Sequence, residues 1–121
     1  MIRHIVFFTA EGPKNVRAIL DGLAPLKSIA EASTFEIVEN QRVDQFGNEI
    51  DVVVYAEFED AAALARYKAS PVYFSVTRHV RNLRKCRYAA DVVADNGNSA
   101  VKASAADASV DAEFSTTMSL P

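Results

Sequence analysis

The chain has 121 residues, of which half are hydrophobic and 24% are charged, and its formal net charge is −3 at pH 7. This length fits one domain with an independent hydrophobic core. The composition is ordinary for a globular protein, and no apolar run approaches the roughly 20 residues that a membrane-spanning helix needs.

The negative charge is concentrated towards the C-terminal end. Residues 1–93 contain twelve Lys/Arg and twelve Asp/Glu, whereas residues 94–121 carry Lys102 against four acidic residues. Because residues 1–93 carry no net charge, the sequence argues against binding to nucleic acid. Because the single cysteine, Cys86, cannot form an internal disulfide, we expect a reducing, cytoplasmic location.

The first predicted element is a strand over residues 2–10, in which side chains alternate between two faces. One face carries Ile2, His4, Val6 and Phe8, and the other carries Arg3, Ile5 and Phe7. Both faces are largely apolar, so we expect this strand to be central in its sheet. An imidazole there is either a pocket residue or a core histidine with one hydrogen-bond partner.

A helix is expected from Pro13, with an apolar stripe at helical spacing. The stripe consists of Val16, Ile19, Leu20, Leu23 and Leu26. Pro25 lies inside it, so the regular helix should kink or end near Ala24. Residues 34–43 and 50–58 then predict two strands, joined by a turn at Gly47-Asn48.

Two helical segments and a strand follow. Asp60 is a suitable N-cap for the first segment, "AAALARYKAS", and Ser70 with Pro71 begins the second. The second has an apolar stripe made of Val72, Val76, Val80 and Leu83. Residues 85–93 predict the last strand.

The resulting order β-α-β-β-α-(α)-β predicts an α+β fold of the ferredoxin-like, split βαβ type, with one antiparallel four-stranded sheet. Both helical regions should cover one face. Ile5, Phe7 and alternate valines of "IDVVVY" indicate that the other face is apolar. Such a face is usually buried against a second copy, so we expect a homodimer.

Residues 94–121 are expected to form a tail separate from the domain at residues 1–93. The tail is rich in Ala, Ser and Asp, which is typical of a linker. Its end, "EFSTTMSL", alternates like a strand and is predicted to dock, with the partner subunit as one candidate docking site.

Few residues point to a metal or cofactor. With two histidines and no carboxylate at ligand spacing, we expect no metal site, and no glycine-rich phosphate loop or other cofactor motif is present. His79 is expected at the surface, near the end of its helix. The sequence has one basic cluster, which consists of Arg78, Arg81, Arg84, Lys85 and Arg87. These residues should not all share a face. We expect them to be mainly solvated surface, with an anion-binding site as the alternative.

Four features of residues 1–93 resemble the stress-responsive A/B barrel (Dabb) family. They are the order of elements, the opening "MIRHIVFF", the stretch "FEDAAALARY" and the following "SP". The resemblance implies a dimeric α+β barrel with a pocket in each subunit between sheet and helices. The resemblance does not imply one particular activity, because most members have none assigned. One plant member is a polyketide cyclase that needs no metal or nucleotide.

The resemblance carries two residues over directly: His4 matches a family pocket histidine and Tyr67 a pocket tyrosine. The family stretch Y-x-x-H-P-x-H reads "YKASPVY" here, so both of its histidines are absent and Tyr73 stands at the position of the cyclase base. A neutral tyrosine is a poor base near pH 7. Val52 and Gly22 stand where the cyclase has a further histidine and tyrosine. The cyclase mechanism therefore does not transfer.

Three readings of function remain open. In the first, a homodimer binds a small apolar or aromatic molecule through His4, Tyr67 and Tyr73. In the second, a cofactor-independent cyclase, lyase or oxygenase uses His4 as acid/base while the two tyrosines orient an oxyanion. In the third, the domain only oligomerises, His4 is a core residue, Tyr67 packs in the core and Tyr73 lies on the surface.

Overall fold

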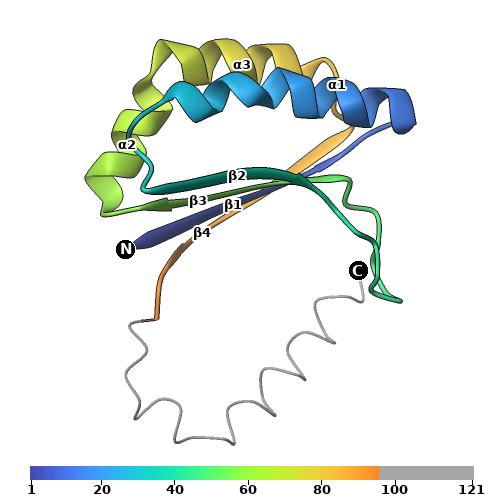
Figure 1. The fold of residues 1–121 in the computed structure, drawn as a ribbon, viewed down its shortest axis with the longest axis horizontal. Helices are drawn as coiled ribbons and strands as arrows, with labels where there is room; N and C mark the ends of the chain where they lie inside the picture. Colours follow the sequence, from blue (N-terminus) through green and yellow to red (C-terminus); the bar gives the residue numbers. More distant parts are fainter. Residues whose placement is uncertain (96–121) are drawn as a thin grey trace, which may run out of the picture.

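The computed structural model describes residues 1–95, which form one four-stranded antiparallel sheet. Its strands are β1 (Ile2–Thr9), β2 (Thr34–Glu39), β3 (Val52–Phe58) and β4 (Cys86–Val93), in the spatial order β2-β3-β1-β4. The helices α1 (Pro13–Leu23), α2 (Ala61–Ala69) and α3 (Pro71–Arg81) lie on one side of the sheet (Figure 1). The predicted ferredoxin-like fold is confirmed, while the predictions for residues 96–121 lie outside the described residues.

The first helix ends where its sequence predicts. Regular α-helix stops at Leu23, and Pro25 lies in the short 3-10 helix η1 (Ala24–Ser28) that follows. Proline fits there because its missing N–H is not required at the start of a helix. Ile19, Leu23 and Leu26 are all buried, so the apolar stripe continues through the change of helix type.

The helices α2 and α3 each begin at a side-chain cap. The Asp60 carboxylate accepts a hydrogen bond from the Ala63 N–H at 2.9 Å, and the Ser70 hydroxyl accepts one from the Val72 N–H at 3.2 Å. The backbone of Ser70 is extended, which ends α2 and separates it from α3. As a result, Tyr67 at the end of α2 comes within 5.0 Å of Tyr73 at the start of α3, measured between ring centroids.

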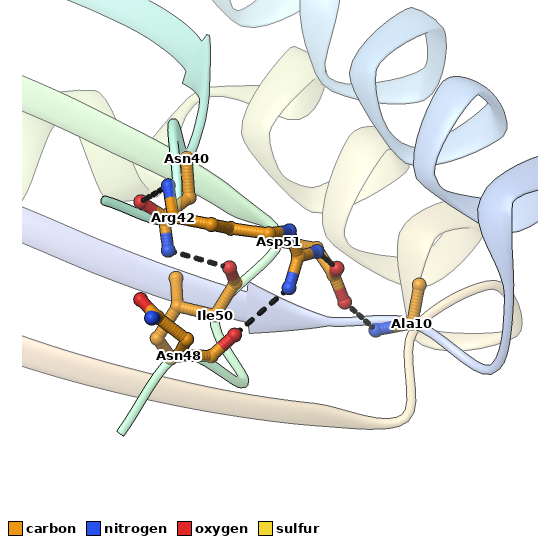
Figure 2. A network of polar contacts seen from close by, with 6 residues as sticks. All are labelled: Ala10, Asn40, Arg42, Asn48, Ile50 and Asp51. Carbon is orange, nitrogen blue, oxygen red and sulfur yellow. Dashed lines mark hydrogen bonds and ion pairs between the residues drawn. The ribbon is translucent and has the colours of Figure 1, made fainter. Parts of the chain in front are cut away.

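The connection between β2 and β3 is longer than expected, because β2 ends at Glu39 and β3 begins at Val52. Asp51 explains the early end: its carboxylate accepts a hydrogen bond from the Ala10 N–H at 2.7 Å and forms an ion pair with Arg42 (Figure 2). Arg42 has φ 58°, a left-handed conformation that a strand does not accommodate. The sequence analysis did not single out Asp51.

Cross-strand rows assign side chains to the two faces of the sheet. On the helix-covered face, Phe35, Ala56, His4 and Asp91 lie in one row across all four strands. On the open face, the corresponding apolar row is Val38, Val53, Phe7 and Tyr88. β1 is central in the sheet, and His4 therefore lies in the middle of the core.

Candidate functional site

His4 lies beneath the helices and is only 1% exposed. Its Nδ1 is 2.5 Å from Oδ1 of Asp91, directly across on β4, and Lys68 Nζ is 3.7 Å from the other oxygen of that carboxylate. Burial lowers the pKa of His4 below its ordinary value, and the hydrogen bond to Asp91, which raises this pKa, offsets only part of the effect. His4 is therefore a neutral imidazole near pH 7. Because an ionised carboxylate only accepts, Nδ1 donates to Asp91 and Nε2 is left as an acceptor.

The two candidate tyrosines extend from His4 towards the molecular surface. The ring of Tyr67 is 6.0 Å from that of His4 and 5.0 Å from that of Tyr73, between centroids. Tyr67 is 1% exposed, and burial raises its pKa well above the ordinary value for tyrosine. It is thus a neutral phenol that can donate a hydrogen bond but cannot act as a base. The structure brings together all three residues that the sequence singled out.

The space directly beside His4 is small. A cavity of 20 Å³ there has room for about one water molecule, which is far too little for an aromatic ring. Five residues of its wall also line a larger pocket of 260 Å³ further out: Phe8, Leu23, Tyr73, Thr77 and Arg87. The room for a ligand therefore begins at Tyr73 rather than at His4.

Three arginines line the larger pocket. Arg81 is the last residue of α3, Arg84 lies in the turn that follows, and Arg87 is on β4. Within the part of the chain that the structure describes, no ion pair engages any of the three. The basic cluster does not share one face as a whole, since Arg78 lies over the Phe74 ring with its Cζ 5.4 Å from the ring centroid. Three of its five members nevertheless converge.

Two polar residues of this site, Asp91 and Thr77, were not indicated by the sequence pattern, whereas the arginines belong to the basic cluster for which an anion site was the alternative. Asp91 is the sole acidic residue of its predicted strand, but only the register of β1 against β4 shows that it faces His4. Thr77 lies outside the apolar stripe from which α3 was predicted. The spacing of three residues between Arg81, Arg84 and Arg87 is the signal that could have suggested a shared position.

A second hollow, of 420 Å³, lies against the first turns of α1. Its charged side chains are largely engaged with the protein itself. Asp51 is bound by the Ala10 N–H and Arg42, and Arg17 forms an ion pair with Asp21 at 3.3 Å. This hollow consequently offers a ligand fewer free polar groups than the pocket at Tyr73.

Two positions differ from what the resemblance assigns to the plant cyclase. A Cβ atom on Gly22 would lie 3.0 Å from Cδ2 of His79 and 3.3 Å from Cγ2 of Val80, so a larger residue there would require these side chains to move. Val52 is fully buried in the core. The two positions at which the resemblance implies a tyrosine and a histidine in the cyclase are therefore occupied here by closely packed Gly22 and by the apolar core residue Val52.

Other candidates have surface or structural positions. His79 is exposed, as expected, and Cys86 is a free thiol of intermediate exposure. Residues 1–95 hold no group of three or more His, Cys, Asp or Glu side chains placed to bind a metal ion. No helix in this range is both long and apolar enough to cross a membrane.

The fold and core place the chain in the ferredoxin-like class of α+β proteins. More specifically, the chain belongs to the Stress responsive A/B Barrel Domain (Dabb) family, whose sequence model matches residues 2–94. The resemblance seen in the sequence is thereby confirmed. A search of the curated proteins found no match to this sequence.

Solved structures with the same fold include a Dabb family protein from Mesorhizobium loti, with 23% identity, a TM-score of 0.65, and coverage of 78% of this chain and 97% of that one. A dimeric ferredoxin-like protein of unknown function from Thermobifida fusca has 18% identity, a TM-score of 0.65, and coverage of 77% and 90%. A putative antibiotic biosynthesis monooxygenase from Nitrosomonas europaea has 16% identity, a TM-score of 0.64, and coverage of 78% and 98%. At these identities the likeness establishes the fold alone.

Proposed function

We propose that this protein is a homodimer that binds one small apolar or aromatic molecule per subunit, in the pocket between the sheet and the helices. The observation that carries the proposal is the 260 Å³ pocket at Tyr73, which shares a wall with the water-sized cavity beside His4. Ligand pockets typically measure about 300–1,000 Å³. A pocket just below that range suits a molecule of one or two rings.

In this proposal the three polar residues act at different depths. The ligand ring packs against Phe8, Leu23 and Tyr73 in the outer pocket. A polar substituent, or one bridging water, occupies the inner cavity and reaches the Nε2 acceptor of His4 and the phenol of Tyr67. The inner residues then select the substituent, while the outer residues supply the apolar contact.

The first test measures the thermal stability of the protein with 2-naphthol, 2-naphthamide and 2-naphthoate. A ligand at about 100 times its Kd adds about 2.7 kcal/mol to the free energy of unfolding by mass action, so Tm should rise. Thr77→Phe fills the shared wall of the two cavities and should abolish the rise. Ser75→Phe, on the exposed side of the same helix, should preserve it.

Two results would contradict binding in this pocket. One is that none of the three probes raises Tm, which would favour a domain that only oligomerises. The other is a rise that persists in Thr77→Phe, which would place the probe elsewhere on the protein.

The hydrogen bond between His4 and Asp91 favours a second candidate, a cofactor-independent cyclase, lyase or oxygenase. Asp91 fixes the imidazole so that the neutral Nε2 can take up a proton, and Tyr67 remains protonated and able to stabilise an oxyanion. In this case His4→Gln and Asp91→Asn should lose turnover of a bound substrate while keeping its affinity. Turnover that survives both substitutions would exclude His4 as the acid/base.

The homodimer is supported by the apolar row on the open face and by the structural neighbours. The proteins of this fold from Thermobifida fusca and Bacteroides fragilis are each described as dimeric. A second copy packed on the open sheet would leave the pocket free, because the pocket is on the side of the helices.

A further inference from the structure

We infer that the ligand of this pocket carries a carboxylate group, which Arg81, Arg84 and Arg87 bind at the pocket rim. The inference rests on the proposed function and adds the chemical class of the ligand. It follows from the three arginines that line the pocket, from the apolar residues that line it with them and from the backbone at the rim.

The three arginines reach the pocket from consecutive segments. The chain turns from the end of α3 into β4, and this reversal brings residues 81, 84 and 87 to one hollow. Arg84 is half-buried, and Arg81 and Arg87 are exposed at the edge. Like charges gathered in this way repel one another, and the described residues supply no carboxylate to any of them. A bound anion would relieve that repulsion.

The local charge is not a consequence of the overall composition. Residues 1–93 contain equal numbers of basic and acidic residues, twelve of each, so a hollow with three arginines and no carboxylate stands apart from the rest of this domain. Phe8, Leu23 and Val80 form the opposing wall and are all buried. The pocket therefore fits a molecule with an apolar end turned inwards and an anionic end at the rim.

The backbone at the rim does not provide the helix N-terminus that phosphate sites commonly use. Phosphate sites commonly use the N–H groups and the positive dipole end of a helix N-terminus. Here the rim lies at the C-terminal end of α3, where the dipole is negative and carbonyl groups point outwards. Recognition must come from side chains, and the planar fork of arginine pairs with a carboxylate through two parallel hydrogen bonds.

Calorimetry with two probes of matched shape tests this inference. 2-Naphthoate and 2-naphthamide differ in charge but hardly in size. The wild type should bind the acid about tenfold more tightly than the amide. In Arg81→Gln/Arg84→Gln/Arg87→Gln the two affinities should agree to within about twofold. Arg78→Gln/Lys85→Gln removes charges of the same cluster that do not line the pocket and should keep the tenfold preference.

Binding of the amide serves as the internal control. If the triple variant still binds 2-naphthamide, its pocket is folded, and the loss of preference reports the missing charges. Equal binding of acid and amide by the wild type would overturn the carboxylate while leaving the proposed function intact. Absence of binding by either probe would overturn both. Tighter binding of 2-naphthyl phosphate than of 2-naphthoate, lost in the triple variant, would overturn the choice of carboxylate.

Discussion

Two opposing effects act on the proton of His4. Burial favours the neutral imidazole, and the Asp91 carboxylate at 2.5 Å favours the imidazolium, with burial the larger of the two. Lys68 and Arg87 also face the imidazole and disfavour its charged form. His4 is therefore a neutral hydrogen-bond acceptor at pH 7, which suits the proposed ligand-binding role.

The lowered pKa of His4 predicts that the protein loses stability as the pH falls. Above pH about 6.5 both the folded and unfolded states carry a neutral His4, so it contributes nothing. Below that pH the unfolded chain binds a proton that the folded state resists, so the free energy of unfolding should fall, by at most about 1.4 kcal/mol per pH unit. Urea unfolding between pH 8 and pH 5 should show this slope in the wild type and in His79→Gln, but reduced in His4→Gln.

The opposite sign would be informative. If the wild type became more stable relative to His4→Gln as the pH fell, then the ion pair with Asp91 would outweigh burial. His4 would in that case be charged in the folded protein and could not act as a base.

The grouping of His4, Tyr67 and Tyr73 was predictable, whereas the room beside them was not. Alternation along β1 and the caps at Asp60 and Ser70 are local features that a sequence displays directly. The cavity next to His4 depends on how side chains from four elements fill space together. The partner of His4 likewise depends on the register between the first and the last strand, which no local pattern encodes.

The same distinction applies to whole elements. The strands and helices were predicted from periodicity, but the β2–β3 connection is set by one buried carboxylate. The Asp51 N–H donates to the Phe8 carbonyl at 2.9 Å, and the Asp51 carbonyl accepts from Asn40 at 2.9 Å. With the bonds from its side chain to Ala10 and Arg42, this residue joins the connection to the end of β1 (Figure 2).

Asp51→Asn should therefore destabilise the protein more than its position in a connecting segment suggests. The change removes the ion pair with Arg42 and weakens the acceptor of the Ala10 N–H, which should cost about 1–3 kcal/mol in the free energy of unfolding. The matched control is Glu49→Gln, an exposed carboxylate two residues away, with an expected effect within about 0.5 kcal/mol. Equal effects of the two substitutions in urea unfolding would show that the Asp51 contacts do not hold the connection.

At the scale of the molecule, the two faces of the sheet differ in how far they are buried. Three helices bury one face, as Figure 1 shows, and nothing among the described residues covers the other. On that open face the row Val38, Val53, Phe7 and Tyr88 crosses all four strands. Val38 is 46% and Tyr88 56% exposed although both are apolar or aromatic. In the proposed homodimer, a second copy of the sheet covers this face.

Sedimentation equilibrium tests this assembly. The wild type should have twice the 13.2 kDa mass of one chain. Val38→Lys/Tyr88→Lys places two charges per protomer on the open face, at side chains already exposed in one subunit, so the subunit should fold. Burying unpaired charges costs several kcal/mol each, which should weaken the dimer by at least roughly a thousandfold and give a mass of one chain. Phe74→Lys, 61% exposed on the helix side, should stay dimeric. A wild-type mass of 13.2 kDa would show that the protein does not dimerise. A double variant that stays dimeric would show that the interface lies elsewhere.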